Sequence, residues 1–283
     1  MLKFTDDISN NGVWTNSELS ILMDKYGAIG PARIGKFIPR HPISSIKKKA
    51  YHLGLSYKFK FVNVDFFNTW SERMAWCVGL IATDGNLYSA KRILNEEKSN
   101  ENVRIDSVDY EIIRKFVSFT GSTYAIREYC IDGRKKEYQT QMTNKDLYYR
   151  MINLGLKERK SLDLQFPKDY PDEWMPGYTR GVWDGDGGVY DYGYLACKIG
   201  MGSINFIRGL DDYLTTFLNL SKHTINIRKT ERPCGEVDCY YTIQLSSDNA
   251  IKLCRYMYHD NMQDAYLTRK YNVWLEYKRR KGI

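Results

Sequence analysis

The sequence predicts an α+β protein in which a small, basic helical module precedes two similar α/β repeats. Three observations support this prediction. A short motif of glycine and aspartate occurs twice, each copy is followed by alternating strand-like and helix-like segments, and most of the excess positive charge lies in the first 60 residues. We expect a first module over residues 1–58, a linker over residues 59–70, and repeats over residues 71–168 and 169–283.

The composition is that of a folded, globular protein. Of the 283 residues, 43% are hydrophobic and 27% are charged, which argues against a largely disordered chain. No apolar run approaches the roughly 20 residues needed to span a bilayer, and the first ten residues are polar and acidic, unlike a signal peptide. We therefore expect a cytoplasmic protein of a bacterial or phage-infected cell, or of an organelle, with no membrane partner.

The charge distribution points to a polyanionic partner. The formal net charge is +8, and residues 1–60 contain ten Lys and Arg against four Asp and Glu, so they carry +6 of it. Basic side chains that neutralise phosphates release condensed counterions, which favours binding to nucleic acid. A merely solvated basic face is the alternative interpretation.

The first module is predicted to contain three short helices. Thr15 is a good N-cap and Glu18, three residues later, completes a capping box, while Gly27 is expected to end the helix. A second helix fits residues 31–37. A third, capped by Ser44 or Ser45, fits apolar residues at three- and four-residue spacing up to Gly54.

Three short helices, the last carrying Lys47, Lys48 and Lys49, match the layout of a helix-turn-helix DNA reader. Trp14 and the segment SIKKKAYHLGL resemble Myb/SANT-like modules and related phage DNA-binding modules. The resemblance implies DNA contacts, which we assign to Arg33, Lys36, Lys47 and Lys48. A three-helix bundle that binds protein is the alternative.

The internal repeat is centred on two motif segments. Residues 75–87 read AWCVGLIATDGNL and residues 177–189 read GYTRGVWDGDGGV. Aligning Gly79 with Gly181 also aligns Asp84 with Asp186, at an offset of 102 residues. Such a spacing fits one small α/β unit.

The segments that follow each motif also repeat. Period-two patterns predict strands, and a helix is expected between the second and third strand and after the fourth, so each repeat is predicted to be αββαββα. The strands are expected at residues 87–93, 102–106, 123–131, 136–142, 188–191, 194–201, 223–229 and 238–245. The helices are expected at residues 110–119, 145–154, 204–218 and 248–257.

The repeated glycines and aspartates suggest a catalytic site. A glycine within a helix costs about 1 kcal/mol relative to alanine, but it allows two helix backbones to approach closely. Pairing the motif helices would bring Asp84 and Asp186 together at one end. An acid at a helix C-terminus opposes the helix dipole, so structure alone does not favour it twice. Two close carboxylates repel each other and provide hard oxygen ligands for a divalent cation.

These motifs resemble the LAGLIDADG motif of homing endonucleases, and the segments LGLKERKS (154–161) and YLTRKY (266–271) agree with that family. The resemblance covers roughly residues 70–283 and implies a monomer whose two pseudo-symmetric repeats form a β-saddle over double-stranded DNA. It implies Mg²⁺, for which Mn²⁺ can substitute, held by Asp84 and Asp186 with the main-chain carbonyls of Thr83 and Gly185. It also implies that Lys160 and Lys270 act near the scissile phosphates.

Two positions depart from the family pattern. The first motif has Ala82 where the second has Asp184, so we interpret Asp184 as structural or auxiliary. The polar residue frequent at the end of the family's second strand is not evident, because Ser107 and Met201 fall in that region.

Outward-facing polar residues on the predicted strands are candidates for reading DNA. Arg, Asn and Gln suit bidentate contacts with guanine and adenine edges in the major groove. A solvated sheet face is the alternative. Because the two halves differ, we expect a loosely palindromic target. The candidates are Arg127, Gln139, Gln141, Lys198, Asn226, Arg228 and Gln244.

These observations together predict a DNA endonuclease that makes a metal-dependent double-strand break in a long site, in the service of a mobile element such as a homing intron. One alternative is an RNA-splicing maturase, the only reading in which RNA is a partner. The other is a catalytically inactive DNA-binding regulator on the same fold, against which the presence of both aspartates argues.

Overall fold

The computed structural model describes residues 13–57, 60–92, 95–130, 135–221, 223–231 and 237–283. The chain divides into two compact units, residues 1–60 and 61–283. Residues 93 and 131, the expected ends of two strands, lie outside the described residues. Within the described ranges, no helix is both long enough and apolar enough to cross a bilayer.

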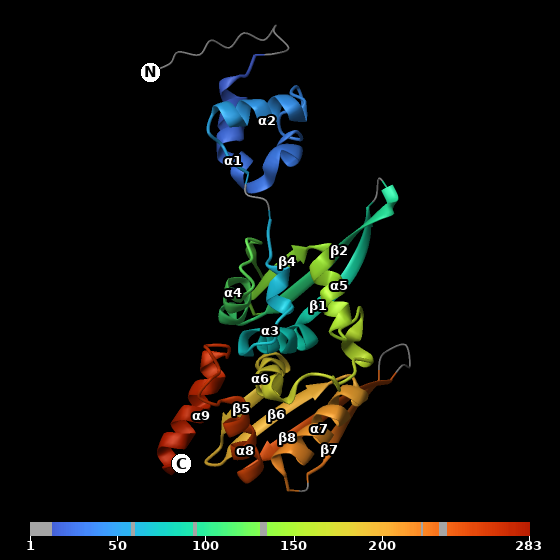
Figure 1. The fold of residues 1–283 in the computed structure, drawn as a ribbon, viewed down its shortest axis with the longest axis vertical. Coiled ribbons are helices and arrows are strands. Elements are labelled where there is room, and N and C mark those ends of the chain that lie inside the picture. Colours follow the sequence, from blue (N-terminus) through green and yellow to red (C-terminus); the bar gives the residue numbers. More distant parts are fainter. Residues whose placement is uncertain (1–12, 58–59, 93–94, 131–134, 222, 232–236) are drawn as a thin grey trace. The chain divides into compact units, whose positions relative to one another are not determined.

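The described part of the first unit is helical and includes α1 and α2 (Figure 1). α1 (Asn16–Ile34) begins with the predicted capping box, in which Thr15 Oγ1 accepts from the backbone N–H of Glu18 and the Glu18 carboxylate accepts from that of Thr15. α1 continues past Gly27 and breaks at Gly30, whose φ of 75° favours glycine. A separate helical segment begins at Pro31 after this break, as predicted, although it ends at Ile34 rather than at residue 37. The three-helix DNA-binding domain as a whole is not confirmed.

α2 (Ile43–His52) follows Pro42 directly. Neither Ser44 nor Ser45 caps it, so that expectation is wrong: Pro42 takes the N-cap position with an extended backbone and makes no side-chain cap. Beside the two helices, the Trp14 ring stacks on the His41 ring at 3.9 Å between centroids. The unit has its own small core, made of Leu22, Tyr26, Ile34, Ile38, Ile46 and Ala50.

The second unit repeats one order of elements. Its first half contains η1 (Val64–Phe67), α3 (Glu72–Thr83), β1 (Gly85–Arg92), β2 (Asn95–Ser107), α4 (Tyr110–Phe119), β3 (Ile126–Tyr129), β4 (Glu137–Thr143), α5 (Lys145–Asn153) and η2 (Lys160–Leu162). Its second half contains η3 (Asp172–Trp174), α6 (Met175–Asp186), β5 (Gly187–Asp191), β6 (Leu195–Met201), α7 (Ile204–Leu218), β7 (Ile225–Glu231), β8 (Val237–Ser246), α8 (Asp248–Met257) and α9 (Thr268–Lys281). The α+β class and the αββαββα order are confirmed.

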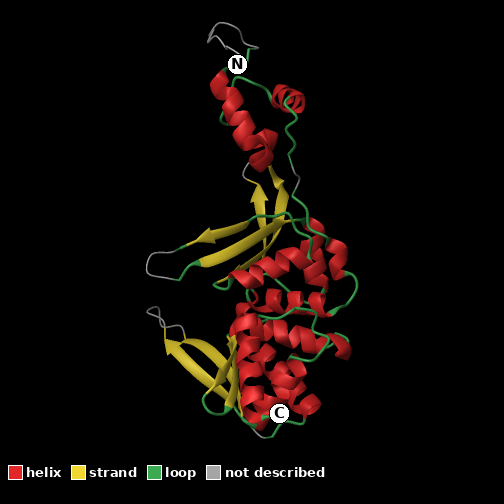
Figure 2. Cartoon of the chain, turned by 90° about the vertical axis from the view of Figure 1, so that its left-hand side faces the viewer, coloured by secondary structure: helices red, strands yellow, loops and turns green. Residues whose placement is uncertain are grey.

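The two sheets have the same topology. Their strand orders are β1-β2-β4-β3 and β5-β6-β8-β7, and all neighbouring strands are antiparallel. Figure 2 shows both sheets on one side of the second unit and the helices on the other. Each sheet thus has one face on the helical core and one face open to solvent.

The two motif helices, α3 and α6, pack against each other where the halves meet (Figure 1). One continuous hydrophobic core runs through both halves and includes the fully buried Trp76 and Trp183. The halves therefore form one folding unit with a shared core.

The segment that enters the second unit is part of its structure. The backbone N–H of Asn63 donates to Thr120 O and that of Thr123 donates to Phe61 O, both at 2.9 Å. Phe67 is fully buried, and Arg150 Nε donates to its carbonyl oxygen at 2.7 Å. A cut after Lys60 would leave these contacts intact.

α9 was not predicted from the sequence. Its residues 278–281 form the exposed last turn of the helix, and Arg280 Nη2 lies 2.6 and 2.7 Å from the two Asp191 carboxylate oxygens. On the inner side of the helix, the side chains of Trp274 and Tyr277 are buried.

Candidate active site

The site is built on the close packing of α3 and α6. A Cβ added to Gly79 would collide with the carbonyl oxygen of Tyr178, and one added to Gly181 would collide with that of Trp76. Only glycine lets the two backbones touch at these points. The sequence interpretation of the two glycines as contact points agrees with this geometry.

The close approach continues to the ends of the helices. Asp84 is the C-cap of α3 and Asp186 is the last residue of α6. A Cβ added to Gly185 would collide with Thr83 Oγ1 and would lie 3.4 Å from Asp84 Cγ. The structure thus brings the two predicted catalytic carboxylates to one end of the helix pair.

The environment disfavours the charged form of both aspartates. Desolvation raises the pKa of Asp84 to about 7, and repulsion from Asp186 adds to the effect, against the attraction of Lys270 and Lys160. Desolvation also raises the pKa of Asp186. Much of this residue is exposed to solvent, but protein atoms surround its carboxylate group. A perturbed carboxylate pair of this kind is typical of a functional site.

Both predicted lysines are buried and reach the ends of the helix pair. Lys160 Nζ donates to Thr83 O at 2.9 Å, and Lys270 Nζ donates to Trp183 O at 2.7 Å and to Asp184 O at 2.8 Å. Desolvation lowers the pKa of each lysine to about 8. Neither residue is therefore a surface lysine.

Asp84 and Asp186 each interact more strongly with the lysine of the other repeat. Lys270 lowers the pKa of Asp84 more than Lys160 does, and Lys160 lowers the pKa of Asp186 more than Lys270 does. A cavity of about 140 Å³ is lined by Thr83, Lys160 and Asp186 among others. These electrostatic interactions group the four side chains into two half-sites, one with Asp84 and Lys270 and the other with Asp186 and Lys160.

Asp184 has a role that the sequence only partly indicated. It is 1% exposed, and its Oδ2 accepts from Trp76 Nε1 and from the backbone N–H of Leu267, both at 2.8 Å. Leu267 precedes the helix that carries Lys270, so Asp184 fixes the start of that helix. The sequence indicated this role only through the difference between Asp184 and Ala82, its counterpart in the first motif. Ala82 has no carboxylate, so it cannot make the equivalent hydrogen bonds to the segment that carries Lys160.

A second buried network of polar side chains was not predicted from the sequence. Arg180 of α6 is fully buried, donates to Glu72 Oε2 of α3 at 2.5 Å, and also donates to the carbonyl oxygens of Met257 and Ala265. His259 Nε2 lies 3.1 Å from Glu72 Oε1. These contacts fix the segment between α8 and α9, and only the position of Arg180 within the motif hinted at them.

The donor set at the helix ends suits a hard divalent cation. Such ions bind carboxylate and carbonyl oxygens together with phosphate oxygens of a substrate. Asp84 and Asp186 provide the carboxylates, but in the described residues no cluster of three or more His, Cys, Asp or Glu side chains could hold a metal by itself. Thr83 O accepts from Lys160, whereas Lys270 bonds to the carbonyls of residues 183 and 184, so the carbonyl of Gly185 remains a predicted ligand only.

The open face of the second sheet carries the expected polar residues. Lys198 pairs in register with Gln244, and Asn226 with Thr242. Lys198, Asn226, Arg228 and Gln244 are all exposed, while Ile199, Ile243 and Leu245 of the opposite face are buried. Ile227 shares the face of Ile243 in register, but it is 58% exposed because β7 is the edge strand.

The open face of the first sheet carries an aspartate beside the expected polar residues. Arg127 is exposed and pairs in register with Gln139, and Gln141 pairs with Arg104. Asp106 lies on the same face, opposite Gln139, and its backbone N–H donates to Asp84 O at 3.4 Å. Neither Arg104 nor Asp106 was among the predicted residues, although both alternate with the buried Val103 and Ile105.

The predicted DNA contacts of the first unit lie at its surface. Arg33, Lys36, Lys47 and Lys48 are all exposed. Lys47 and Lys48 belong to α2, whose Ile46 and Ala50 face the core. The structure leaves all four side chains available to a ligand.

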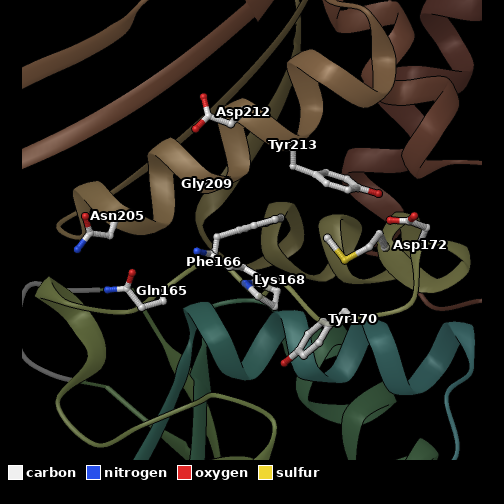
Figure 3. A pocket seen from close by; sticks show the side chains of 11 residues that line it. Gln165, Phe166, Lys168, Tyr170, Asp172, Asn205, Gly209, Asp212 and Tyr213 are labelled. Carbon is white, nitrogen blue, oxygen red and sulfur yellow. The ribbon is translucent and has the colours of Figure 1, made fainter.

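A larger cavity of about 390 Å³ lies elsewhere in the second unit, beside α7 (Figure 3). Phe166, Tyr170 and Tyr213 line it together with Asp172, Asp212 and other residues. It contains neither Asp84, Asp186 nor the two lysines, so the candidate chemistry is not located in this cavity.

Comparison with known proteins gave structural neighbours only. No protein-family model matches the sequence, and no curated protein matches it. The similar solved structures include the LAGLIDADG meganuclease I-CpaMI bound to uncleaved DNA, with 13% identity, a TM-score of 0.44, and coverage of 75% of this chain and 93% of that one.

Two further neighbours have similar values. The homing endonuclease I-WcaI bound to its DNA recognition sequence has 13% identity, a TM-score of 0.42, and coverage of 74% of this chain and 90% of that one. The meganuclease I-SmaMI bound to uncleavable DNA has 12% identity, a TM-score of 0.41, and coverage of 75% and 98%.

Proposed function

We propose that this chain is a site-specific DNA endonuclease of the LAGLIDADG homing type, which hydrolyses both strands of a duplex with the help of a divalent cation. The observation that carries the proposal is the pair of carboxylates, Asp84 and Asp186, at the ends of two glycine-packed helices, each with a buried lysine beside it. An isolated structural acid at an exposed helix end would require neither a second carboxylate nor the buried lysines.

The residues have distinct tasks in this proposal. Asp84 and Asp186 would hold Mg²⁺ or Mn²⁺ with main-chain carbonyls, and the bound cation would supply activation of water and neutralisation of charge on the phosphate. With a pKa of about 8, Lys160 and Lys270 are largely protonated at neutral pH, and each ammonium can stabilise negative charge on a phosphate or leaving oxygen.

The two half-sites would act on different strands. The open sheet faces supply polar side chains for base contacts, and they differ between the halves, which favours a loosely palindromic target. We further propose that residues 1–60 act as a DNA-binding arm through Arg33, Lys36, Lys47 and Lys48, and that the protein works as a monomer because one chain carries both half-sites.

The proposal is tested by selecting cleaved ends from a randomised duplex library with Mg²⁺, followed by strand-resolved cleavage of the recovered site. We expect cuts in both strands with Mg²⁺ and binding without appreciable cleavage with Ca²⁺. Replacing Lys270 with methionine should slow one strand and replacing Lys160 the other. Absence of cleavage in all metals, with selective binding retained, would favour the catalytically inactive regulator.

A further inference from the structure

Asp106 is the centre of a side-chain network on the open face of the first sheet. Its Oδ1 accepts from Gln139 Nε2 at 2.6 Å, and its Oδ2 accepts from Arg104 Nε at 2.7 Å. The Tyr129 hydroxyl lies 3.1 Å from Asp106 Oδ1 and 2.7 Å from Glu137 Oε2. The second sheet has Gly200, without a side chain, at the position that corresponds to Asp106 in register.

The network fixes which edge of Gln139 is free. An ionised carboxylate can only accept hydrogen bonds, so the Gln139 amide must turn its nitrogen toward Asp106. The amide oxygen and the second N–H of Gln139 remain available. An acceptor and a donor side by side match the N6 and N7 atoms of adenine in the major groove.

The same carboxylate also fixes Arg104. Because Arg104 Nε is engaged by Asp106, the guanidinium is held by that side and its two terminal nitrogens remain for a ligand. Two parallel N–H donors match the O6 and N7 atoms of guanine. Asp106 also offsets the charge of Arg104, so this pair adds little to non-specific attraction for phosphates.

We propose that Asp106 is a positioning residue for sequence recognition, which presents Gln139 to an adenine and Arg104 to a guanine. Gln139 lies opposite Asp106 and Arg104 opposite Gln141, so Gln139 and Arg104 are diagonal neighbours about 7–8 Å apart. That separation equals about two steps of roughly 3.4 Å along a DNA strand. The two bases are therefore expected about two base pairs apart, and this inference rests on the proposed function.

The structure offers a matched control for Asp106. Glu137 lies on the same face of the same sheet and contacts Tyr129, but it has no bond to Gln139 or Arg104. Glu137→Gln therefore makes the same change of charge as Asp106→Asn without removing a hydrogen bond of Gln139 or Arg104. An asparagine at position 106 can donate as well as accept, so it would allow the Gln139 amide to turn over.

The experiment selects bound duplexes from a randomised pool with the full-length protein in Ca²⁺ and sequences them. For the wild type we expect an adenine and a guanine about two base pairs apart, and Gln139→Leu and Arg104→Leu should each remove one of these preferences, which assigns the positions. Asp106→Asn should weaken both preferences, each by about fivefold to a hundredfold, with affinity for random duplex unchanged or higher because one negative charge is removed. Glu137→Gln should keep both.

The outcomes separate this inference from the proposed function. Wild-type protein that selects no DNA would contradict the endonuclease proposal itself. Selective wild-type binding with unaltered preferences in Asp106→Asn, or with the same loss in Glu137→Gln, would overturn the role of Asp106. If Asp106→Asn does not fold in a thermal unfolding assay, Gln139→Leu and Arg104→Leu provide the test. The inference is overturned if both of these variants keep both base preferences.

Discussion

At the scale of single residues, the Asp84 carboxyl has a strongly raised pKa. Its pKa is raised from 3.8 to about 7, chiefly by desolvation. A group whose pKa is higher in the folded state binds protons more readily when folded, so stability falls as the pH rises from about 4 to about 7. Above pH 7 the full penalty of the charged carboxylate is present.

Replacing Asp84 with asparagine is therefore expected to stabilise the metal-free protein at pH 8. The gain is on the order of 1 kcal/mol, because solvent screening reduces the free energy that corresponds to the pKa shift. This corresponds to roughly 2–4 °C in the midpoint of thermal unfolding. At pH 4 the gain should vanish, because Asp84 is then neutral in the wild type. A variant that is less stable than wild type at pH 8 would show that Asp84 is a structural cap.

The carboxylate pair of the candidate active site was predictable from the sequence, but its supporting residues were not. Repetition at a fixed offset identified Asp84 and Asp186, because the repeat aligned them with glycines that only a close helix pair requires. The burial of Lys270 depends on Asp184, Trp76 and Leu267, which come from three separate segments. Contacts between segments distant in sequence leave no local pattern.

At the scale of secondary-structure elements, the site depends on the contact between α3 and α6. Replacing Gly79 with alanine would drive its Cβ into the carbonyl oxygen of Tyr178, and backbone cannot move aside as a flexible side chain can. We expect a loss of about 3 kcal/mol or failure to fold, measured by chemical denaturation. Gly35→Ala is the control, because its nearest neighbour would be 3.7 Å away. Equal stability of both variants would contradict the proposed helix contact.

Element boundaries were predictable where apolar periodicity is strong. The helices α4, α7 and α8 have the expected bounds, because each buries one regular apolar face. β2 begins at Asn95 rather than at residue 102, because its polar first half is held by pairing with β1. α9 was missed because it is very polar and only Lys270, Trp274 and Tyr277 of it are buried.

At the scale of the whole molecule, the first 60 residues carry most of the net charge. Deleting them should weaken DNA binding and flatten its dependence on salt, by about 0.9 in the log–log slope for each phosphate that is no longer neutralised. If Arg33, Lys36, Lys47 and Lys48 all bind phosphates, the change is about 3.6. The remaining unit keeps the contacts of Phe61, Asn63 and Phe67 and should still cleave at higher protein concentration.

Two variants of the full-length protein serve as controls for this deletion, a double substitution and a single substitution. Lys47→Ala with Lys48→Ala should reproduce part of the loss of affinity, whereas Lys25→Ala should not, because Lys25 already pairs with Asp24 at 3.0 Å. An unchanged salt slope after the deletion would show that the first unit does not bind DNA.

The proposed activity requires that Asp84 and Asp186 together perform metal-dependent cleavage of DNA. The decisive experiment measures single-turnover cleavage and equilibrium binding of a selected duplex for wild type, Asp84→Asn and Asp186→Asn, with Asp212→Asn as a control on the surface of α7. We expect each active-site variant to lose double-strand cleavage in Mg²⁺ while its affinity for the duplex stays within about tenfold, and the control to cleave like wild type. Full double-strand cleavage by either active-site variant would refute the paired-aspartate mechanism.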